Sequence, residues 1–194
     1  LLGRSAVTSR KAAIKIRKLD LDGYAPYLLE ALKMEYDKNH NDTETELIET
    51  LGLKGDKEAK EFIKEFYVDK EYFATPSVRA YVRLNRARLS DVDDVIYFLK
   101  EDDLAKTEAV LSALGYDKIV PSVEDQDEII RLSWNAGADR AKGFTDPRYG
   151  LAAACVGWTS SLKVPFLEHC LTSNDEPLRY VAQNSLKNKY VKLR

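Results

Sequence analysis

The stretch Ala25-Pro26-Tyr27-Leu28-Leu29-Glu30-Ala31-Leu32 decides the fold. Ala25, Leu28, Leu29 and Leu32 follow the i, i+3, i+4, i+7 spacing, which places four apolar side chains on one face of an α-helix. The same spacing begins again at residues 59 and 92, so successive copies are 34 and 33 residues apart. These copies are Ala59, Phe62, Ile63 and Phe66, and Val92, Val95, Ile96 and Leu99. A recurrence of this length predicts a repeat architecture.

Two further copies complete this first series, whose members we name A helices. Val164, Leu167 and Leu171 form one copy 72 residues after the third, which is about two periods. A weaker copy with Ile129 and Ile130 lies between them. The A helices are therefore expected at 24–36, 57–67, 91–100, 123–134 and 163–172.

A second series alternates with the first, and we name its members B helices. Four of them place an arginine near their start, followed by small or apolar residues, at Arg10, Arg79, Arg148 and Arg179. The other two keep the helical periodicity without the arginine. The B helices are expected at 9–19, 43–53, 76–88, 104–114, 147–158 and 176–190. The sequence thus predicts an all-α chain of about eleven helices in strict alternation.

Capping residues indicate where some of these helices begin and end. Asp146-Pro147 and Thr75-Pro76 each put a capping residue before proline, which predicts that proline opens the helix. Gly52 and Gly115 are expected just after the last turn of two B helices, where glycine is favoured.

Composition agrees with a compact helical chain. The 194 residues are 44% apolar and 32% charged, and a chain of this length buries a core without needing a disulfide or a metal. Only 9 glycines and 6 prolines occur, which predicts few and short loops. Charged residues interrupt every apolar stretch before the roughly 18 to 20 residues that span a bilayer, so no membrane span is expected.

At this point the chain resembles the HEAT-like repeat family. The segment Leu51-Gly52-Leu53-Lys54-Gly55-Asp56-Lys57-Glu58-Ala59 is similar to the family's turn between helices, and residues 164–179 resemble an A helix, a turn and the start of a B helix. The resemblance implies an α-α superhelix, or solenoid, of antiparallel helices whose B helices line the concave face. It also implies that Asp175 and Arg179 belong to a structural ladder.

The resemblance covers nearly the whole chain, so we expect one HEAT-like repeat domain over residues 1–194. The chain begins on a B helix without a preceding A helix, and its first residue is Leu1 rather than Met. Both features predict a fragment of a longer or processed chain. The compartment stays open, with the cytoplasm slightly favoured and a removed signal segment as the alternative.

No residue pattern predicts catalysis. His40, in a polar turn, and His169 have no second ligand at metal spacing, and no glycine loop of a nucleotide-binding kind precedes a helix. Cys155 and Cys170 are expected as small buried hydrophobes, although an oxidising compartment would allow them to form a disulfide. We therefore expect no enzyme, no cofactor and no metal site.

The candidate binding residues are basic and aromatic. Arg79, Arg83 and Arg86 follow i, i+4, i+7 spacing on one B helix, which aligns three cations. They either meet an anionic partner or pair with acids from neighbouring helices. The longest connection, residues 135–145, is a second candidate because long loops on a scaffold often bind ligands. The predicted partner-binding residues are Arg79, Arg83, Arg86, Tyr81, Trp134, Arg140 and Phe144.

The predicted function is a non-catalytic scaffold module that binds a protein or peptide, with acidic partners included, in an unknown oligomeric state. One alternative is a nucleic-acid-binding protein similar to a HEAT-like DNA-repair glycosylase, using Trp134, Trp158, Asp139 and Arg148. The net charge of −2 disfavours nucleic acid, because phosphate contacts need clustered lysine and arginine. The other alternative is an inactive helical domain of a larger enzyme.

Overall fold

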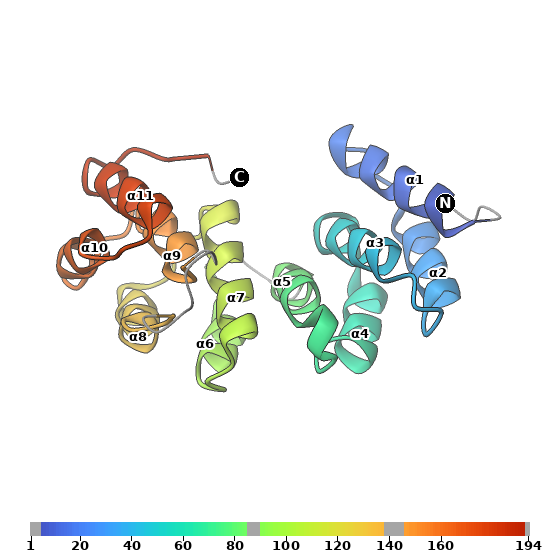
Figure 1. The fold of residues 1–194 in the computed structure, drawn as a ribbon, viewed down its shortest axis with the longest axis horizontal. Helices are drawn as coiled ribbons and strands as arrows, with labels where there is room; N and C mark the ends of the chain where they lie inside the picture. The colour runs from blue at the N-terminus through green and yellow to red at the C-terminus, as the bar shows by residue number, and fades with distance from the viewer. Residues whose placement is uncertain (1–4, 85–89, 138–145, 193–194) are drawn as a thin grey trace. The chain divides into compact units, whose positions relative to one another are not determined.

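The computed structural model describes residues 5–84, 90–137 and 146–192, and within them the chain is helical without any strand (Figure 1). A short 3₁₀-helix, η1 (Glu71–Phe73), accompanies the α-helices. The α-helices are α1 (Ala6–Lys18), α2 (Ala25–Glu35), α3 (Asn41–Lys54), α4 (Lys57–Phe66), α5 (Ala74–Leu84), α6 (Asp93–Leu99), α7 (Leu104–Asp117), α8 (Val123–Ser133), α9 (Arg148–Ala154), α10 (Lys163–Leu171) and α11 (Glu176–Leu186).

The all-α prediction is confirmed, and each of the eleven predicted helices overlaps one of these α-helices. The largest differences are at helix ends. The chain adds η1 before α5, α7 runs three residues beyond its predicted end at 114, and α9 and α11 end at Ala154 and Leu186 rather than near 158 and 190. The apolar periodicity therefore located the helices, whereas their ends depend on local contacts.

The predicted role of Gly52 and Gly115 as helix terminators is wrong. Both glycines lie inside helices, in α3 and α7. Helix α7 ends instead at Asp117, and its C-cap residue Lys118 takes the left-handed conformation with φ 52°. Gly52 is needed for helix packing, because a Cβ atom there would lie 2.8 Å from the Cα atom of Ala80 on α5. Glycine here allows two helices to approach closely.

The two proline signals mark helix starts with small offsets. Helix α5 begins at Ala74, directly after η1, so Thr75 is not its cap. Pro76 is the third residue of α5, where a backbone N–H would have no intrahelical acceptor. Helix α9 begins one residue after Pro147, and a carboxylate oxygen of Asp146 accepts the backbone N–H of Arg148 at 2.9 Å.

The chain divides into two compact units, residues 1–85 and 86–194. In the first unit α3 contacts both α1 and α5, while α2 packs on α3 and α4 packs on α5. In the second unit α9 contacts both α7 and α11, while α6 packs on α7 and α10 packs on α11 (Figure 1). Each unit thus has three B helices side by side and A helices against them.

Each unit has its own apolar core. In the first unit the largest fully buried side chains include Leu28, Leu47, Ile63 and Tyr67. In the second they include Leu111, Leu114, Ile129 and Phe166. Among the described helices none combines the length and the apolar composition needed to cross a membrane.

The close contact between α7 and α9 gives a test of the packing. A Cβ atom on Gly150 would lie 2.3 Å from the carbonyl oxygen of Leu111 and 2.7 Å from the Cα atom of Ser112. Gly150→Ala should therefore lower the free energy of unfolding by about 1–3 kcal/mol, the usual cost of overpacking. Elsewhere in a helix the same change stabilises by about 1 kcal/mol. Urea unfolding followed by circular dichroism measures the difference.

A matched control is Gln183→Ala on the exposed side of α11, which should change the free energy of unfolding by less than about 0.5 kcal/mol. Stabilisation by Gly150→Ala would contradict the close approach of α7 and α9.

Candidate functional site

The first predicted site residue, Arg79 on α5, belongs to a row of ion pairs that crosses three B helices. Arg17 of α1 contacts two carboxylates of α3, Glu46 at 2.6 Å and Glu49 at 3.4 Å. Glu49 in turn lies 3.6 Å from Arg79. We name Arg17, Glu46, Glu49 and Arg79 the charged row. Their side chains are 21–29% exposed, so the row remains open to solvent on the face of the B helices.

The remaining residues of the arginine stripe have different surroundings. The Nε atom of Arg79 is buried and has no hydrogen-bond partner in the described part of the chain. Arg83 is half-buried one turn further along α5, whereas Arg86 lies outside the described residues. Tyr81 is only 7% exposed, and the ammonium groups of Lys60 and Lys64 lie 5.4 and 5.9 Å from its ring centre. Tyr81 therefore packs within the first unit more than it faces solvent.

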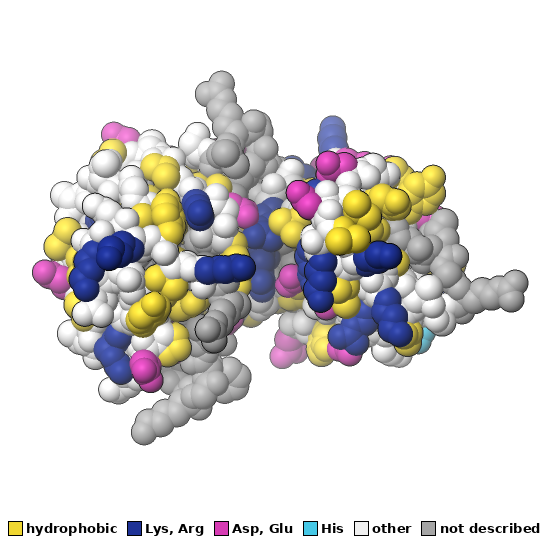
Figure 2. All heavy atoms as spheres, turned by 90° about the horizontal axis from the view of Figure 1, so that it is seen from above, with side chains coloured by type: hydrophobic (Ala, Val, Ile, Leu, Met, Phe, Trp, Pro, Cys, Tyr) yellow, Lys and Arg dark blue, Asp and Glu magenta, His cyan; other side chains and the backbone are white. Residues whose placement is uncertain are grey.

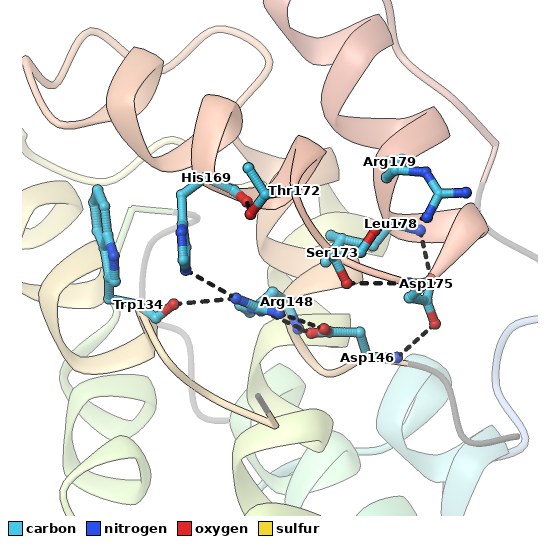
Figure 3. A network of polar contacts seen from close by, with 9 residues as sticks. All are labelled: Trp134, Asp146, Arg148, His169, Thr172, Ser173, Asp175, Leu178 and Arg179. Atoms are coloured by element: carbon cyan, nitrogen blue, oxygen red, sulfur yellow. Dashed lines mark hydrogen bonds and ion pairs between the residues drawn. The ribbon is translucent and has the colours of Figure 1, made fainter. Parts of the chain in front are cut away.

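Trp134, the predicted aromatic residue of the second unit, is part of a polar network around Arg148 (Figure 3). The Arg148 guanidinium is buried and donates to both carboxylate oxygens of Asp146, at 2.9 and 2.6 Å. Its Nη1 donates to the carbonyl oxygen of Trp134 and contacts Nε2 of His169, both at 3.3 Å. The His169 ring stacks on the Trp134 indole, with ring centres 5.4 Å apart. Arg148 thus joins the end of α8, the start of α9 and α10.

The two residues expected in a structural ladder are neighbours of this network. One oxygen of the Asp175 carboxylate accepts the backbone N–H of Leu178 at 2.7 Å and caps α11, while the other accepts the backbone N–H of Asp146 at 3.2 Å. Arg179 donates to the carbonyl oxygen of Ser173 at 2.6 Å. Asp175 therefore ties the start of α11 to the start of α9 (Figure 3).

The residues named for a glycosylase-like site are largely used inside the second unit. Trp158 is 2% exposed and donates its indole N–H to the carbonyl oxygen of Ile119 at 2.7 Å. Arg148 is 5% exposed and paired with Asp146. Asp139, like the predicted partner-binding residues Arg140 and Phe144, lies outside the described residues.

The two cysteines were the remaining candidates for chemistry. Cys155 and Cys170 are buried, as predicted, and neither forms a disulfide. Burial raises the pKa of the Cys170 thiol to about 12 and that of Cys155 further, so neither is a nucleophilic thiolate at neutral pH. In the described part of the chain no three histidine, cysteine, aspartate or glutamate side chains gather as metal ligands would.

A cluster of polar groups at the turn from α2 to α3 was missed by the sequence reasoning. Glu35, 7% exposed, accepts a hydrogen bond from Nδ1 of His40 at 2.5 Å. Glu44, 2% exposed, accepts one from the buried Tyr67 hydroxyl at 2.9 Å. The sequence did carry a signal, because both glutamates continue an apolar stripe, Glu35 after Leu28 and Leu32, and Glu44 before Leu47 and Ile48. A carboxylate on a buried face needs a partner.

Comparisons with known proteins add no family to this geometry: no protein-family model, curated protein or solved structure matches the chain.

The buried pair of Arg148 and Asp146 makes a strong prediction for stability. Asp146→Ala leaves the guanidinium buried without its carboxylate and should lower the free energy of unfolding by about 3–5 kcal/mol. The double variant Asp146→Ala, Arg148→Met removes both charges and should lose clearly less than the sum of the two single changes. Urea unfolding of all four proteins measures the coupling. Additive losses would show that the two side chains stabilise the unit independently.

The buried Glu44 carboxyl predicts a pH dependence of stability. Burial is the main cause that raises its pKa, helped by the nearby Asp37 and Glu35, while the Tyr67 hydroxyl and Lys70 oppose the shift. Because the folded chain holds this proton more tightly than the unfolded chain, the contribution of Glu44 to stability falls as pH rises from its ordinary pKa through the raised one.

Glu44→Gln keeps an acceptor for Tyr67 and removes the ionisation. The variant should therefore gain stability relative to the natural chain as pH rises from about 4 to about 7. Thermal unfolding across this range measures the difference, with the exposed Glu61→Gln on α4 as the control. A difference for Glu44→Gln that is the same at every pH would contradict a raised pKa.

Proposed function

We propose that the chain is a HEAT-like α-solenoid repeat protein that binds an acidic protein or peptide without catalysing a reaction. The alternation of A and B helices supports this proposal, as do the contacts of α3 with both α1 and α5 and of α9 with both α7 and α11. Stacked helix pairs of this kind present an extended surface without an inherent reaction centre.

The observation that carries the proposal is the charged row on the B helices of the first unit. Arg17 pairs with both Glu46 and Glu49, and Arg79 shares Glu49 with it at 3.6 Å. Partly exposed ion pairs of this kind contribute little to stability, about 0–1 kcal/mol each. A carboxylate of a partner can approach such an arginine because its internal pairing at 3.6 Å is long for a charge-assisted hydrogen bond.

The alternatives receive less support from the same contacts. A glycosylase-like function would use Trp158 and Arg148. Their polar groups are already hydrogen-bonded inside the second unit, to Ile119 and to Asp146. No contact in the described part of the chain favours a helical domain of a larger enzyme over a scaffold protein.

The test starts from a phage-displayed library of random peptides selected on the immobilised chain. We expect enrichment of acidic peptides whose affinity falls in the triple variant Arg79→Gln, Arg83→Gln, Arg86→Gln. The loss should be greater at low salt, because exposed charge pairs are screened at high salt. Fluorescence anisotropy measures affinity, and circular dichroism checks that each variant is folded.

A control with the same change in charge is Lys100→Gln, Arg131→Gln, Lys163→Gln in the second unit, which should bind the selected peptides as the natural chain does. No enrichment, or equal weakening in both triple variants, would contradict a binding face on the B helices. Unfolding of the arginine variant alone would assign the three arginines to the scaffold.

A further inference from the structure

The cations of α1 fall into two sets that differ in their partners. Arg10 and Arg17 face α3, where Arg10 pairs with Asp42 at 2.9 Å and Arg17 pairs with Glu46 and Glu49. Lys11, Lys15 and Lys18 follow the i, i+4, i+7 spacing on the face of α1 opposite its buried side, and all three are exposed. Within the described part of the chain no carboxylate pairs with these three lysines. We name them the lysine stripe.

The need for a polar surface at the end of a repeat protein does not explain why the exposed charges of α1 are all positive. Repeat proteins need a polar outer face at their ends, but mixed charges serve that purpose equally well. Helix α1 holds five cations and no acid. The helix dipole favours Lys15 and Lys18 in the last turn, whereas it gives no advantage to Lys11 in the middle of the helix. Like charges three and four residues apart repel, so the stripe favours an anionic partner.

A pocket of about 700 Å³ begins beside the stripe and is formed by α1, the start of α3 and Tyr72. One wall is apolar, with Val7 and Ile14 from α1 and the exposed ring of Tyr72, and the other is polar and includes Asp42, whose carboxylate is paired with Arg10. Lys11 and His40 lie at the same pocket, and the His40 ring is held by the buried Glu35. A pocket with an apolar wall next to aligned cations suits a ligand that combines an apolar side chain with carboxylates.

Exposed apolar side chains also lie beside the lysine stripe outside the pocket. Val7 and Leu19 are 59% and 56% exposed at the two ends of α1. Figure 2, which looks down on the view of Figure 1, shows basic side chains beside apolar ones on the unit that contains α1. The side chains of Ser9, Ala13 and Ile16 on the other face of α1 are buried in the core of the first unit. This apolar face is therefore already used in folding and does not face a membrane.

We propose that the lysine stripe and the adjoining pocket bind an acidic peptide segment that carries a bulky apolar side chain. The partner's carboxylates contact Lys11, Lys15 and Lys18, and its apolar side chain enters the pocket between Val7, Ile14 and Tyr72. This inference rests on the proposed function and adds to it a second surface, separate from the charged row, and a partner class. Recognition by charge makes the association fast and salt-dependent, while the pocket selects for the apolar side chain.

The test uses a fluorescein-labelled peptide of four Glu-Glu-Leu repeats, whose binding to the full chain is followed by fluorescence anisotropy. The variant Lys11→Gln, Lys15→Gln, Lys18→Gln should weaken binding about tenfold at low salt, as expected for the loss of three exposed ion pairs. The control Lys38→Gln, Lys57→Gln, Lys64→Gln makes the same charge change on other elements of the first unit and should change affinity less than about twofold. A peptide of Glu-Glu-Ser repeats should bind more weakly than the leucine peptide.

The pocket is tested separately by Ile14→Ser, which should weaken the leucine peptide and leave the serine peptide unchanged. Equal weakening by the two lysine variants, or no preference for leucine over serine, would overturn the proposal. It would also be overturned if phosphatidylserine vesicles or a single-stranded oligonucleotide bound through the stripe and the peptide did not. Self-association lost in the stripe variant, without peptide binding, would assign the surface to a second copy of the chain.

The proposed function and this inference fail in different experiments. If peptide binding depends on Arg79 and Arg83 but not on the lysine stripe, the scaffold function stands and the second surface is excluded. If it depends on the stripe alone, the binding face lies on α1 and not on the charged row.

Discussion

The rest of the structure depends on the close approach of neighbouring B helices. In both units a helix meets its neighbour at a glycine whose Cβ position is already occupied by that neighbour's atoms, at Gly52 against Ala80 and at Gly150 against Leu111 and Ser112. A backbone contact of this kind fixes how the two helices lie side by side, because close-packed interiors do not absorb even one extra methyl group without strain. The A helices then pack against these B helices, with α2 on α3, α4 on α5, α6 on α7 and α10 on α11.

This spacing decides which charges meet. With α3 held between α1 and α5, Glu46 and Glu49 come within reach of Arg17 on one side, and Glu49 comes within reach of Arg79 on the other. In the second unit Arg148 is buried, and its donors are used by Asp146 and by the carbonyl oxygen of Trp134. The arginines of the B series thus differ in their surroundings: Arg148 is buried in the second unit, whereas the Arg79 side chain is 21% exposed beside Glu49.

The sequence predicted the helices well because burial of one helix face imposes a period that local residues reveal. It failed where the cause is a contact between distant segments. Gly52 was predicted to end a helix because glycine is common there, yet only the position of Ala80 on another helix shows why it lies inside α3. For the candidate site, spacing predicted that Arg79 and Arg83 share a helix, but it could not show that Glu49 pairs with Arg79 or that Tyr81 is buried.

The buried glutamates connect the fold to the surface beside α1. A polar group in an apolar stripe is costly unless it is hydrogen-bonded, so Glu35 is tied to His40 in the turn before α3 and Glu44 is tied to Tyr67 at the end of α4. Asp37 and Asn39 take left-handed conformations in this turn, and the hydrogen bond from His40 to Glu35 closes it. His40 then precedes the first turn of α3, where it lines the pocket together with α1. The hydrogen bond between His40 and the buried Glu35 therefore holds in place the wall of the pocket that the lysine stripe adjoins.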